Sequence, residues 1–531
     1  MKLKYSYLEY VALPVYQQIF YKFYRFLWFL IWAVYDLFKG LGLSVFNFFK
    51  KVVITIKKMA VALRYGDWAT KLSFLFVGTS YIKRGQIVKG ILMIALEIVF
   101  ILYFALFAAS TFSGFFTLGT IHRVSYICPV DDLSDVAGQI FSEFEDNLAA
   151  AQAAGCTFPE LYQQPDNSGK LLLYGVITLV IIIAFIIFYT KSTIGAFRVE
   201  CNREEGKHIN SFKEDVGELL NGKFHITLLT LPIIGIVVFT IFPLIDMILI
   251  AFTNYDKTHA YEAGSTFSWV GFRNFGLLTQ FGQGAYGNTF ASLFRWTIVW
   301  AILATFTNFI LGILIATLIN KKGIKLKGLW RTCLVLSVAL PQFVSLLAMS
   351  QFFGNDGLLH DLIFRLTGNS VTFWNHKYVA RTLIVIINIW IGVPFTVLST
   401  TGILMNIPAD LYESARIDGA NPVTMYTKIT VPYIIFVLGP SLITTFIGNV
   451  NNFGVIYLLT GGGPKNAELD PTGIAGDTSI LITWLYGLTT GDNKQYYLAS
   501  VIGIVIFIIS SVLSLLVYRN SSSYKNEEDF A

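Results

Sequence analysis

Charged residues are scarce in this chain. Asp, Glu, Lys and Arg make up 14% of its 531 residues, and 55% of the residues are hydrophobic. A globular domain usually carries about 25% charged residues. Several apolar runs reach the ~20 residues that a helix needs to cross a hydrocarbon core of ~30 Å. The composition therefore excludes an ordinary soluble protein and predicts an all-α protein that crosses a membrane many times.

Motifs of enzymes and nucleotide-binding proteins are also missing. The chain has no G-x-x-x-x-G-K-[S/T] phosphate-binding loop and no H-E-x-x-H metal motif, and its six histidines are scattered singly. We therefore predict that the chain is not an enzyme and binds no cofactor or metal ion itself. If ATP drives its activity, another subunit must supply the ATPase.

Cysteine is rare, with four residues in the whole chain. Cys128 and Cys156 both fall in the loop 110–170, which we place outside the cell, where a disulfide can form. Spacing alone does not decide whether these two residues are bonded. Cys201 and Cys333 fall on the cytoplasmic side or inside a span, and we expect them to be inert.

Positive charge is concentrated at the N-terminus. Residues 1–89 contain 14 Lys and Arg against three acidic residues, a net charge of +11, and the remainder carries −5. The apolar run Phe26–Tyr35 is short for a span. We interpret residues 1–75 as one or two amphipathic helices in the cytoplasmic membrane interface, with a spanning hairpin as the alternative. Attraction to anionic lipid explains the charge better than binding to nucleic acid.

The apolar runs predict about eight membrane-spanning helices. They lie at 88–109, 171–190, 226–252, 292–319, 331–353, 379–404, 433–459 and 496–518. Lys and Arg gather in the loops 191–223 and 320–331, so the positive-inside rule places these loops and both termini in the cytoplasm. The predicted divisions are interfacial helices at 1–75, two spans with an external loop at 76–225, a core of six spans at 226–518, and a cytoplasmic tail at 519–531.

A polar island at 406–432 interrupts the last apolar runs. Gly419 divides it, and Asn421 and Pro422 are typical of the cap and first turn of a second short helix, which we expect to end near Pro432. A helical hairpin between two spans cannot lie in lipid. We therefore expect it to project into the cytoplasm and contact another protein, with an ordinary amphipathic loop as the alternative.

The spacing within this island resembles the EAA loop of permease subunits of bacterial ATP-binding-cassette importers. Ser414 is a departure, because the family usually has a second alanine there. The resemblance implies a coupling helix that docks into a cytoplasmic ATPase, with Glu413 making a charged contact. The implied coupling residues are Glu413, Ser414, Ala415, Asp418, Gly419, Ile429 and Pro432.

Further segments extend the resemblance over about residues 78–518, closest to the larger permease subunit of maltose and maltodextrin importers. The matching segments include Ala251–Tyr255 (AFTNY), Trp269–Phe275 (WVGFRNF) and Gly461–Pro464 (GGGP). In enteric bacteria that subunit carries a large folded insert after its third span. The interval 253–290 is too short for such a domain, so the chain resembles the Gram-positive type. The loop 110–170, with a predicted helix at 131–154, could form a small cap instead.

Polar side chains inside the predicted spans are costly in hydrocarbon and therefore indicate a pathway. The densest set lies in 433–459, where Thr445, Asn449 and Asn452 share a helical face. Amides and hydroxyls both donate and accept hydrogen bonds, which suits an uncharged sugar. Hydrogen bonding between helices is an equally well supported role on the residues alone.

The resemblance places the sugar site on this face and on the sixth span. The implied substrate-binding residues are Asn449, Asn452, Thr445, Gly392, Phe395 and Ile391. Phe395 departs from the expected tyrosine, so that ring stacking is kept and a hydroxyl is lost. The missing hydroxyl argues against a strict preference for maltose.

The resemblance also implies the function and the partners. The chain would be a transmembrane subunit that imports maltose or maltodextrin-type oligosaccharides across the bacterial plasma membrane. It would pair with a second, homologous permease, two copies of an ATPase that uses ATP and Mg²⁺, and an extracellular sugar-binding protein, soluble or lipid-anchored. Another sugar or glycerol phosphate stays open as the substrate. An ion-coupled secondary transporter is the alternative from another class, but it would need paired ionisable residues inside the membrane.

Overall fold

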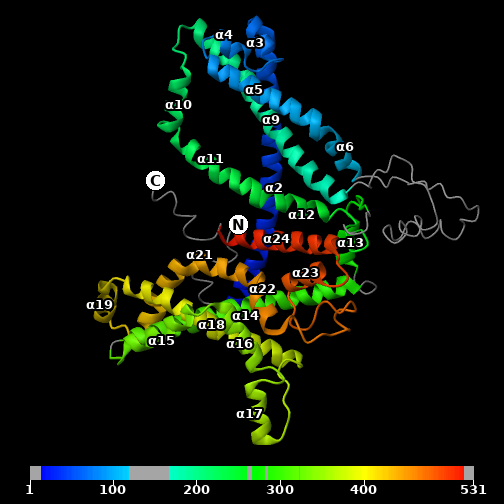
Figure 1. Ribbon diagram of the computed structural model, residues 1–531. Helices are drawn as coiled ribbons and strands as arrows, with labels where there is room; N and C mark the ends of the chain where they lie inside the picture. The colour runs from blue at the N-terminus through cyan, green and yellow to red at the C-terminus, as the bar shows by residue number, and fades with distance from the viewer. Residues whose placement is uncertain (1–13, 119–166, 260–265, 281–284, 322, 519–531) are drawn as a thin grey trace, which may run out of the picture. The chain divides into compact units, whose positions relative to one another are not determined.

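The computed structural model describes residues 14–118, 167–259, 266–280, 285–321 and 323–518. Within these ranges the chain is helical, and the only β-type pairings are isolated bridges between Thr253 and Trp269 and between Lys465 and Gly476. The chain divides into two compact units, Met1–Gly271 and Phe272–Ala531 (Figure 1). The predicted all-α membrane fold is confirmed. Cys128, Cys156 and the helix predicted at 131–154 lie outside the described residues.

The first unit is built on long helices. Its helices are α2 (Val15–Tyr65), α3 (Trp68–Leu72), α4 (Thr79–Lys83), α5 (Ile87–Tyr103), α6 (Ala109–Thr117), α9 (Ser168–Glu204), α10 (Phe212–Leu220), α11 (Phe224–Ile236) and α12 (Phe242–Ile250). π-helical turns at Phe104–Ala108 and Val237–Ile241 join α5 to α6 and α11 to α12. A buried cluster of Phe115, Leu172 and Val176 packs α6 against α9.

Helix α2 is continuous from Val15 to Tyr65, a length of 51 residues. At 1.5 Å per residue it extends about 77 Å, more than twice the ~30 Å hydrocarbon core. The short apolar run at Phe26–Tyr35 is therefore one part of a single long helix. Whether α2 lies in the membrane interface stays a prediction.

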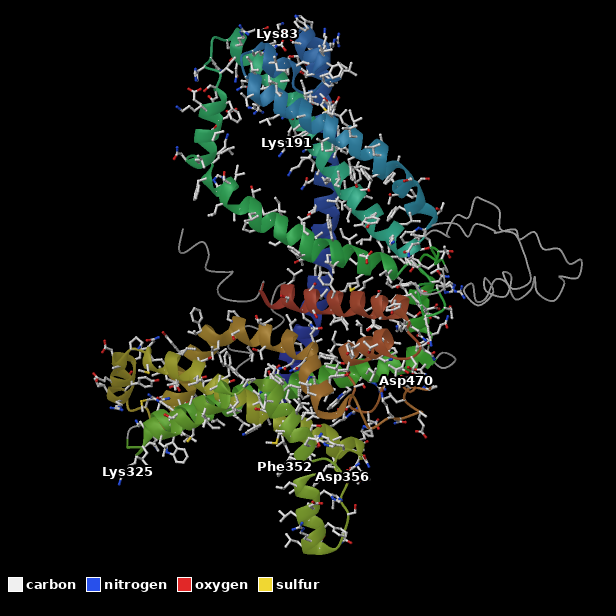
Figure 2. The ribbon with its side chains drawn as sticks, in the orientation of Figure 1. Lys83, Lys191, Lys325, Phe352, Asp356 and Asp470 are labelled. Atoms are coloured by element: carbon white, nitrogen blue, oxygen red, sulfur yellow. The ribbon has the colours of Figure 1, made fainter. Side chains whose placement is uncertain are left out.

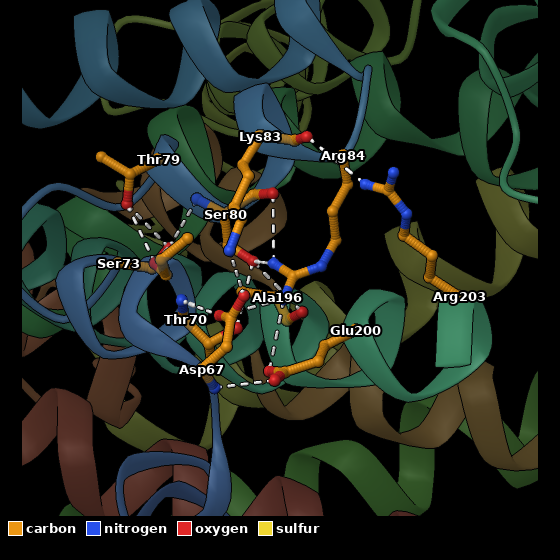
Figure 3. A network of polar contacts seen from close by, with 11 residues as sticks. Asp67, Thr70, Ser73, Thr79, Ser80, Lys83, Arg84, Ala196, Glu200 and Arg203 are labelled. Atoms are coloured by element: carbon orange, nitrogen blue, oxygen red, sulfur yellow. Dashed lines mark hydrogen bonds and ion pairs between the residues drawn. The ribbon is translucent and has the colours of Figure 1, made fainter. Parts of the chain in front are cut away.

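A buried ionic network ties the segment after α2 to α9 (Figure 3). The Arg84 side chain is 3% exposed, and its guanidinium lies 3.1 Å from Asp67 Oδ1 and 3.4 Å from Glu200 Oε2. Lys83 pairs with Asp67 at 2.6 Å, and the Asp67 backbone N–H donates to Glu200 Oε1 at 2.7 Å. Two carboxylates thus compensate the buried guanidinium, which would be costly to leave unpaired.

Hydroxyl groups complete this network (Figure 3). Arg84 also donates to the Ser80 hydroxyl, which is hydrogen-bonded to the Thr70 hydroxyl at 3.2 Å. Burial raises the pKa of Asp67, but hydrogen bonds from Lys83 and the Thr70 backbone, together with the charge of Arg84, outweigh it. The Asp67 pKa is therefore held well below its usual range, and the carboxylate stays ionised.

The second unit contains the remaining helices. They are α13 (Arg273–Thr279), α14 (Ala285–Asn320), α15 (Lys327–Ala339), α16 (Gln342–Phe352), α17 (Leu358–Thr367), α18 (Lys377–Met405), α19 (Ala409–Ile417), α20 (Pro422–Met425), α21 (Val431–Val450), α22 (Phe453–Thr460), α23 (Leu481–Thr490) and α24 (Tyr496–Tyr518). Its core includes Trp300, Ile384, Ile456 and Ile480. Phe352 and Asp356 mark the turn between α16 and α17 (Figure 2).

Two glycines allow α14 and α18 to pack closely. A Cβ on Gly312 would lie 2.4 Å from Cγ2 of Thr396, and a Cβ on Gly392 would lie 2.3 Å from Nδ2 of Asn308. Each helix therefore places a polar side chain over a glycine of the other. This close packing fixes where those polar side chains lie.

Seven helical segments among the described residues are long and apolar enough to cross a membrane. They are Ile87–Thr117, Ser168–Glu204, Phe224–Ile250, Tyr286–Asn320, Lys377–Met405, Pro422–Val450 and Tyr496–Leu515. The predicted span 331–353 is different, because extended backbone at Leu340 and Pro341 separates α15 from α16. Proline removes a helical hydrogen bond and clashes with the carbonyl four residues earlier, which explains the break.

Candidate functional site

A cavity of about 520 Å³ lies in the second unit, among α14, α15, α16, α18 and α21. Its polar lining residues are Thr305, Asn308, Gln342, Ser345, Asn388, Thr396, Ser399, Ser441, Thr445, Asn449 and Asn452. None of its described lining residues is charged. The volume falls within the usual ~300–1,000 Å³ of small-molecule sites. Because amides and hydroxyls donate and accept, the walls suit an uncharged ligand with many hydroxyl groups.

All six residues predicted to bind substrate line this cavity. They are Ile391, Gly392 and Phe395 on α18, Thr445 and Asn449 on α21, and Asn452 after α21. Phe395 lines the cavity and is 65% exposed, so much of its side chain is uncovered. An aromatic ring of this kind can stack on the apolar face of a sugar. The structure thus brings these side chains together, and their contact with a ligand stays a prediction.

The arrangement of the asparagines differs from the expected helical face. Helix α21 ends at Val450, and Asn452 becomes the cap of α22, where its side chain accepts from the Val455 N–H at 3.2 Å. The Asn452 amide also donates to Asn449 Oδ1 at 3.2 Å. The two residues are therefore in contact as expected, but the helix breaks between them, and the predicted continuous span 433–459 is wrong at this point.

Asn449 is committed to bonds between helices. Its amide nitrogen donates to Thr305 Oγ1 on α14 at 2.9 Å, and its backbone carbonyl accepts from the Trp300 indole at 3.0 Å. Its side-chain oxygen already accepts from Asn452. The interhelical role, which the residues alone supported equally, is thus what Asn449 performs in this structure.

Asn308 and Asn388 are lining residues that the sequence analysis did not identify. Both are buried, and neither Asn308 Oδ1 nor Asn388 Nδ2 has a hydrogen-bond partner among the described residues. An unpaired buried amide costs about 1–3 kcal/mol. Each is an asparagine inside a predicted span, so the cost of polar groups in hydrocarbon was the signal that could have identified them.

The break at Pro341 also contributes to the cavity. Leu340, Pro341 and Gln342 all line it, and the backbone of the first two is extended. Irregular backbone at membrane depth is tolerated where it is covered by protein or lines a polar space. The interruption of the predicted span therefore has a structural role in the cavity wall.

The polar island forms the helical hairpin that the sequence predicts. Helix α19 ends at Ile417, and Gly419 follows with a φ of 76°, a conformation that favours glycine. The Ala420 N–H donates back to the Ala415 carbonyl at 2.9 Å. The Asn421 side chain caps α20.

The predicted coupling residues divide by exposure. Glu413, Ser414, Asp418, Gly419 and Pro432 are exposed, and Ala415 and Ile429 are half-buried. The hydroxyls of Tyr412 and Thr430 are hydrogen-bonded at 2.8 Å, which joins the two halves of the hairpin. Ile417 is 87% exposed, so the hairpin presents apolar surface beside its carboxylates. Such a mixed surface is suited to contact with a protein.

The second helix of the hairpin does not end near Pro432, contrary to the prediction. A π-helical turn at Tyr426–Thr430 joins α20 to α21, and the Val431 N–H donates to the Tyr426 carbonyl five residues earlier. Pro432 lies in the first turn of α21, directly after this π-helical turn, and the helix continues through it. One continuous rod, Pro422–Val450, therefore connects the hairpin to the cavity wall.

Among the residues that the structure describes, no group of three His, Cys, Asp or Glu side chains is placed to hold a metal ion. Neither Cys201 nor Cys333 forms a disulfide bond with a described residue.

Comparison with known proteins gives concordant matches. Residues 308–523 match the family described as the binding-protein-dependent transport system inner membrane component. The maltodextrin permease MdxF of Bacillus subtilis is 33% identical over 68% of this chain and 84% of its own length. The galactooligosaccharide permease GanP of the same organism is 33% identical over 68% and 85%. The maltodextrin permease MalC of Streptococcus pneumoniae is 28% identical over 85% and 95%.

Proposed function

Because the chain belongs to the family of inner membrane components of binding-protein-dependent transport systems, we propose that it imports an uncharged oligosaccharide of the maltodextrin class. The uncharged cavity is the observation that carries this proposal. Its wall offers amides and hydroxyls to sugar hydroxyls and an exposed ring, Phe395, to a sugar face. The related permeases are named for maltodextrin and for galactooligosaccharides.

The residues of the cavity would have different roles in binding the sugar. Asn308 and Asn388 have unpaired amide atoms, so sugar hydroxyls would satisfy groups that are now unsatisfied. Thr445 and Asn452 would add hydrogen bonds, while Ile391, Gly392 and Phe395 would shape the α18 side. Asn449 would act by holding α21 to α14.

The hairpin would link the chain to its energy source. In this proposal it docks into a cytoplasmic ATPase present in two copies, with Glu413 in a charged contact and Gly419 at the turn. ATP and Mg²⁺ would be used by that partner, because this chain would contribute no catalytic group. A second, homologous permease and an extracellular sugar-binding protein would complete the importer, with both termini of this chain in the cytoplasm.

The continuous rod Pro422–Val450 would carry the motion. Closure of the ATPases on ATP would displace the hairpin, and the rod would transmit this displacement to Asn449 and the cavity wall. The cavity would then alternate between access from outside and access from inside.

The proposal is tested by uptake and ATPase assays on the full importer in proteoliposomes, with labelled maltodextrin and loaded binding protein. Replacing Glu413 by Ala should lower both uptake and stimulated ATPase activity several-fold while the protein inserts normally. Glu468, which is exposed and far along the chain from the hairpin, gives the matched control Glu468→Ala. Normal coupled uptake by Glu413→Ala would contradict the docking role.

The same preparation tests the two alternatives. Competition by galactooligosaccharide or glycerol phosphate ranks the other substrates, and a phosphorylated substrate is disfavoured because the described lining has no Lys or Arg. Uptake driven by an ion gradient without ATP would overturn the importer and revive secondary transport.

A further inference from the structure

A second hollow lies along α14 and α18 of the second unit and shares no lining residue with the cavity described above. Its volume is about 600 Å³. The lining residues are Ser292, Arg295, Trp296, Val299 and Leu303 on α14, and Lys377, Tyr378, Arg381, Thr382, Val385 and Ile386 on α18. We call this hollow the α14–α18 groove.

One end of the α14–α18 groove is strongly positive. It is lined by Arg295, Lys377 and Arg381, and no acidic residue is among its described lining. Lys377 Nζ lies 3.4 Å from Oδ1 of Asp477 outside the lining, and Arg381 donates to the carbonyl of that residue at 2.8 Å. The described residues form no ion pair with Arg295. One carboxylate, on Asp477, pairs with Lys377, so the three cations of the lining leave an excess of positive charge.

The other end of the groove is apolar. Val299 and Leu303 follow Arg295 at spacings of four and eight residues, so they continue the same helix face. Val385 and Ile386 continue the opposite wall on α18. The two walls run in the same direction, because the early residue Trp296 meets Arg381 while the later residue Asn308 meets Gly392.

The length of the groove matches one leaflet of a bilayer. From Ser292 to Leu303 the α14 wall rises about 16 Å, at 1.5 Å per residue. Half of a ~30 Å hydrocarbon core is about 15 Å. A polar end followed by one leaflet of apolar wall has the shape and polarity of a single phospholipid.

We propose that the α14–α18 groove binds one anionic phospholipid, with its phosphate at Arg295 and Lys377 and an acyl chain along Val299 and Leu303. Arginine and lysine are the side chains that recognise phosphate. The guanidinium of Arg381 lies 4.0 Å over the Trp296 ring and forms the floor of the headgroup site. The predicted topology puts this end of both helices at the external face, where Lys and Arg are otherwise scarce.

The chemistry of the groove favours a lipid over other occupants. A soluble phosphate would use the positive end and leave Val299 and Leu303, which are 46% and 39% exposed, without a role. An apolar helix from a partner subunit would cover those residues and bury Arg295 without a counter-charge, which is costly. A phospholipid with a net negative charge satisfies both ends.

Native mass spectrometry of the full chain in neutral detergent tests the proposal, with phosphatidylglycerol, phosphatidylcholine and soluble glycerol phosphate as probes. We expect phosphatidylglycerol to bind in a 1:1 ratio and more tightly than phosphatidylcholine. Arg295→Gln should lower the affinity for phosphatidylglycerol about five-fold, and Lys377→Gln should lower it by a similar factor. Each basic residue near a lipid headgroup contributes ~1 kcal/mol to binding. Lys325→Gln, beyond the opposite end of α14, should leave it unchanged (Figure 2).

Several outcomes would overturn the proposal. Equal affinity for the two lipids, or binding that neither Arg295→Gln nor Lys377→Gln weakens, would exclude an anionic headgroup site. Displacement of phosphatidylglycerol by an equal concentration of glycerol phosphate would show that the ligand is a soluble anion. A third outcome would show that a protein helix fills the groove. In that case no lipid would bind, and Leu303→Asn would release the second permease from the purified importer. Unchanged thermal unfolding of each variant is the check that it folds.

Discussion

The two units of the molecule use buried polar groups in opposite ways. In the first unit, Asp67, Arg84 and Glu200 carry full charges that pair with one another. In the second unit, the cavity wall is uncharged, and Asn308 and Asn388 each keep an amide atom without a partner among the described residues. The charged network holds the helices of the first unit together through its ion pairs, whereas the unpaired amide atoms beside the cavity leave hydrogen-bonding capacity unused.

Asn449 shows that the difference between bonded and unpaired polar groups also applies to single residues. It lines the cavity, but its amide groups are already bonded to Thr305 and Asn452. Like the ionic network of the first unit, its side chain bonds to other parts of the fold, and its contact with a ligand stays a prediction. Position on a cavity wall is thus insufficient evidence for ligand contact, and the partners of each atom must be counted.

The largest expected effect comes from breaking the ionic network. Arg84→Leu would leave Asp67 and Glu200 without their buried counter-charge, so we expect a loss of about 3–5 kcal/mol in the free energy of unfolding. Thermal unfolding in detergent measures it. Arg203→Leu is the matched control, since its guanidinium is exposed and makes only a 3.5 Å contact with the Lys83 carbonyl. Equal losses in both variants would contradict the structural role of Arg84.

A smaller effect is expected from filling the close contact between α14 and α18. In Gly392→Ala the new methyl group would meet the Asn308 amide, and overpacking of this kind costs about 1–3 kcal/mol. Maltodextrin uptake should also fall, because the new methyl group displaces the Asn308 side chain from its place in the cavity wall. The control is Gly402→Ala on the same helix, where a Cβ has open space. If both variants unfold and transport alike, the close packing is not what positions Asn308.

The two asparagines separate binding from stability. Asn388→Leu removes an amide with an unpaired nitrogen. We expect the KM for maltodextrin to rise about ten-fold, because ~1.5 kcal/mol of hydrogen bonding to the sugar is lost. The unfolding temperature should not change. Asn449→Leu should instead lower the unfolding temperature, because Thr305 and Asn452 lose their partner. The reverse pattern would exchange the roles that we assign to these residues.

The smallest effect is a dependence of stability on pH. Because the pKa of Asp67 is depressed in the folded protein, its ionic contacts stabilise the fold above the ordinary carboxyl pKa of 3.8, and that stability is lost as the pH falls below it. Asp67→Asn should therefore narrow the difference in unfolding temperature between pH 6 and pH 3. An unchanged pH dependence would show that other carboxyl groups dominate the acid sensitivity.

Hydropathy was sufficient to locate the spans but not their interruptions. The runs 331–353 and 433–459 stay apolar enough overall across Pro341 and across Asn451 that length and hydropathy predicted single helices. Proline fixes the first break, and the second depends on Asn452, whose side chain caps the next helix. Such caps compete with helix continuation only when the tertiary packing favours them.

The sequence likewise predicted part of the candidate site. The residues on 379–404 and 433–459 that the family resemblance implied all line the cavity. Asn308 and Asn388 could not be singled out from the sequence, because what distinguishes them is an amide atom without a partner in the folded chain. The two partners of Asn449 are likewise distant in sequence, on or after other helices.

The rod that runs unbroken from Pro422 to Val450 has a mechanical consequence. Its length is about 42 Å, so under the proposed function it would act as a lever between the hairpin and the cavity wall. A tilt of about 5° about one end would displace the other by about 4 Å, more than the length of a hydrogen bond. If the hairpin docks as proposed, a small displacement at that end would be enough to exchange one set of hydrogen bonds for another around the cavity, without any helix unfolding.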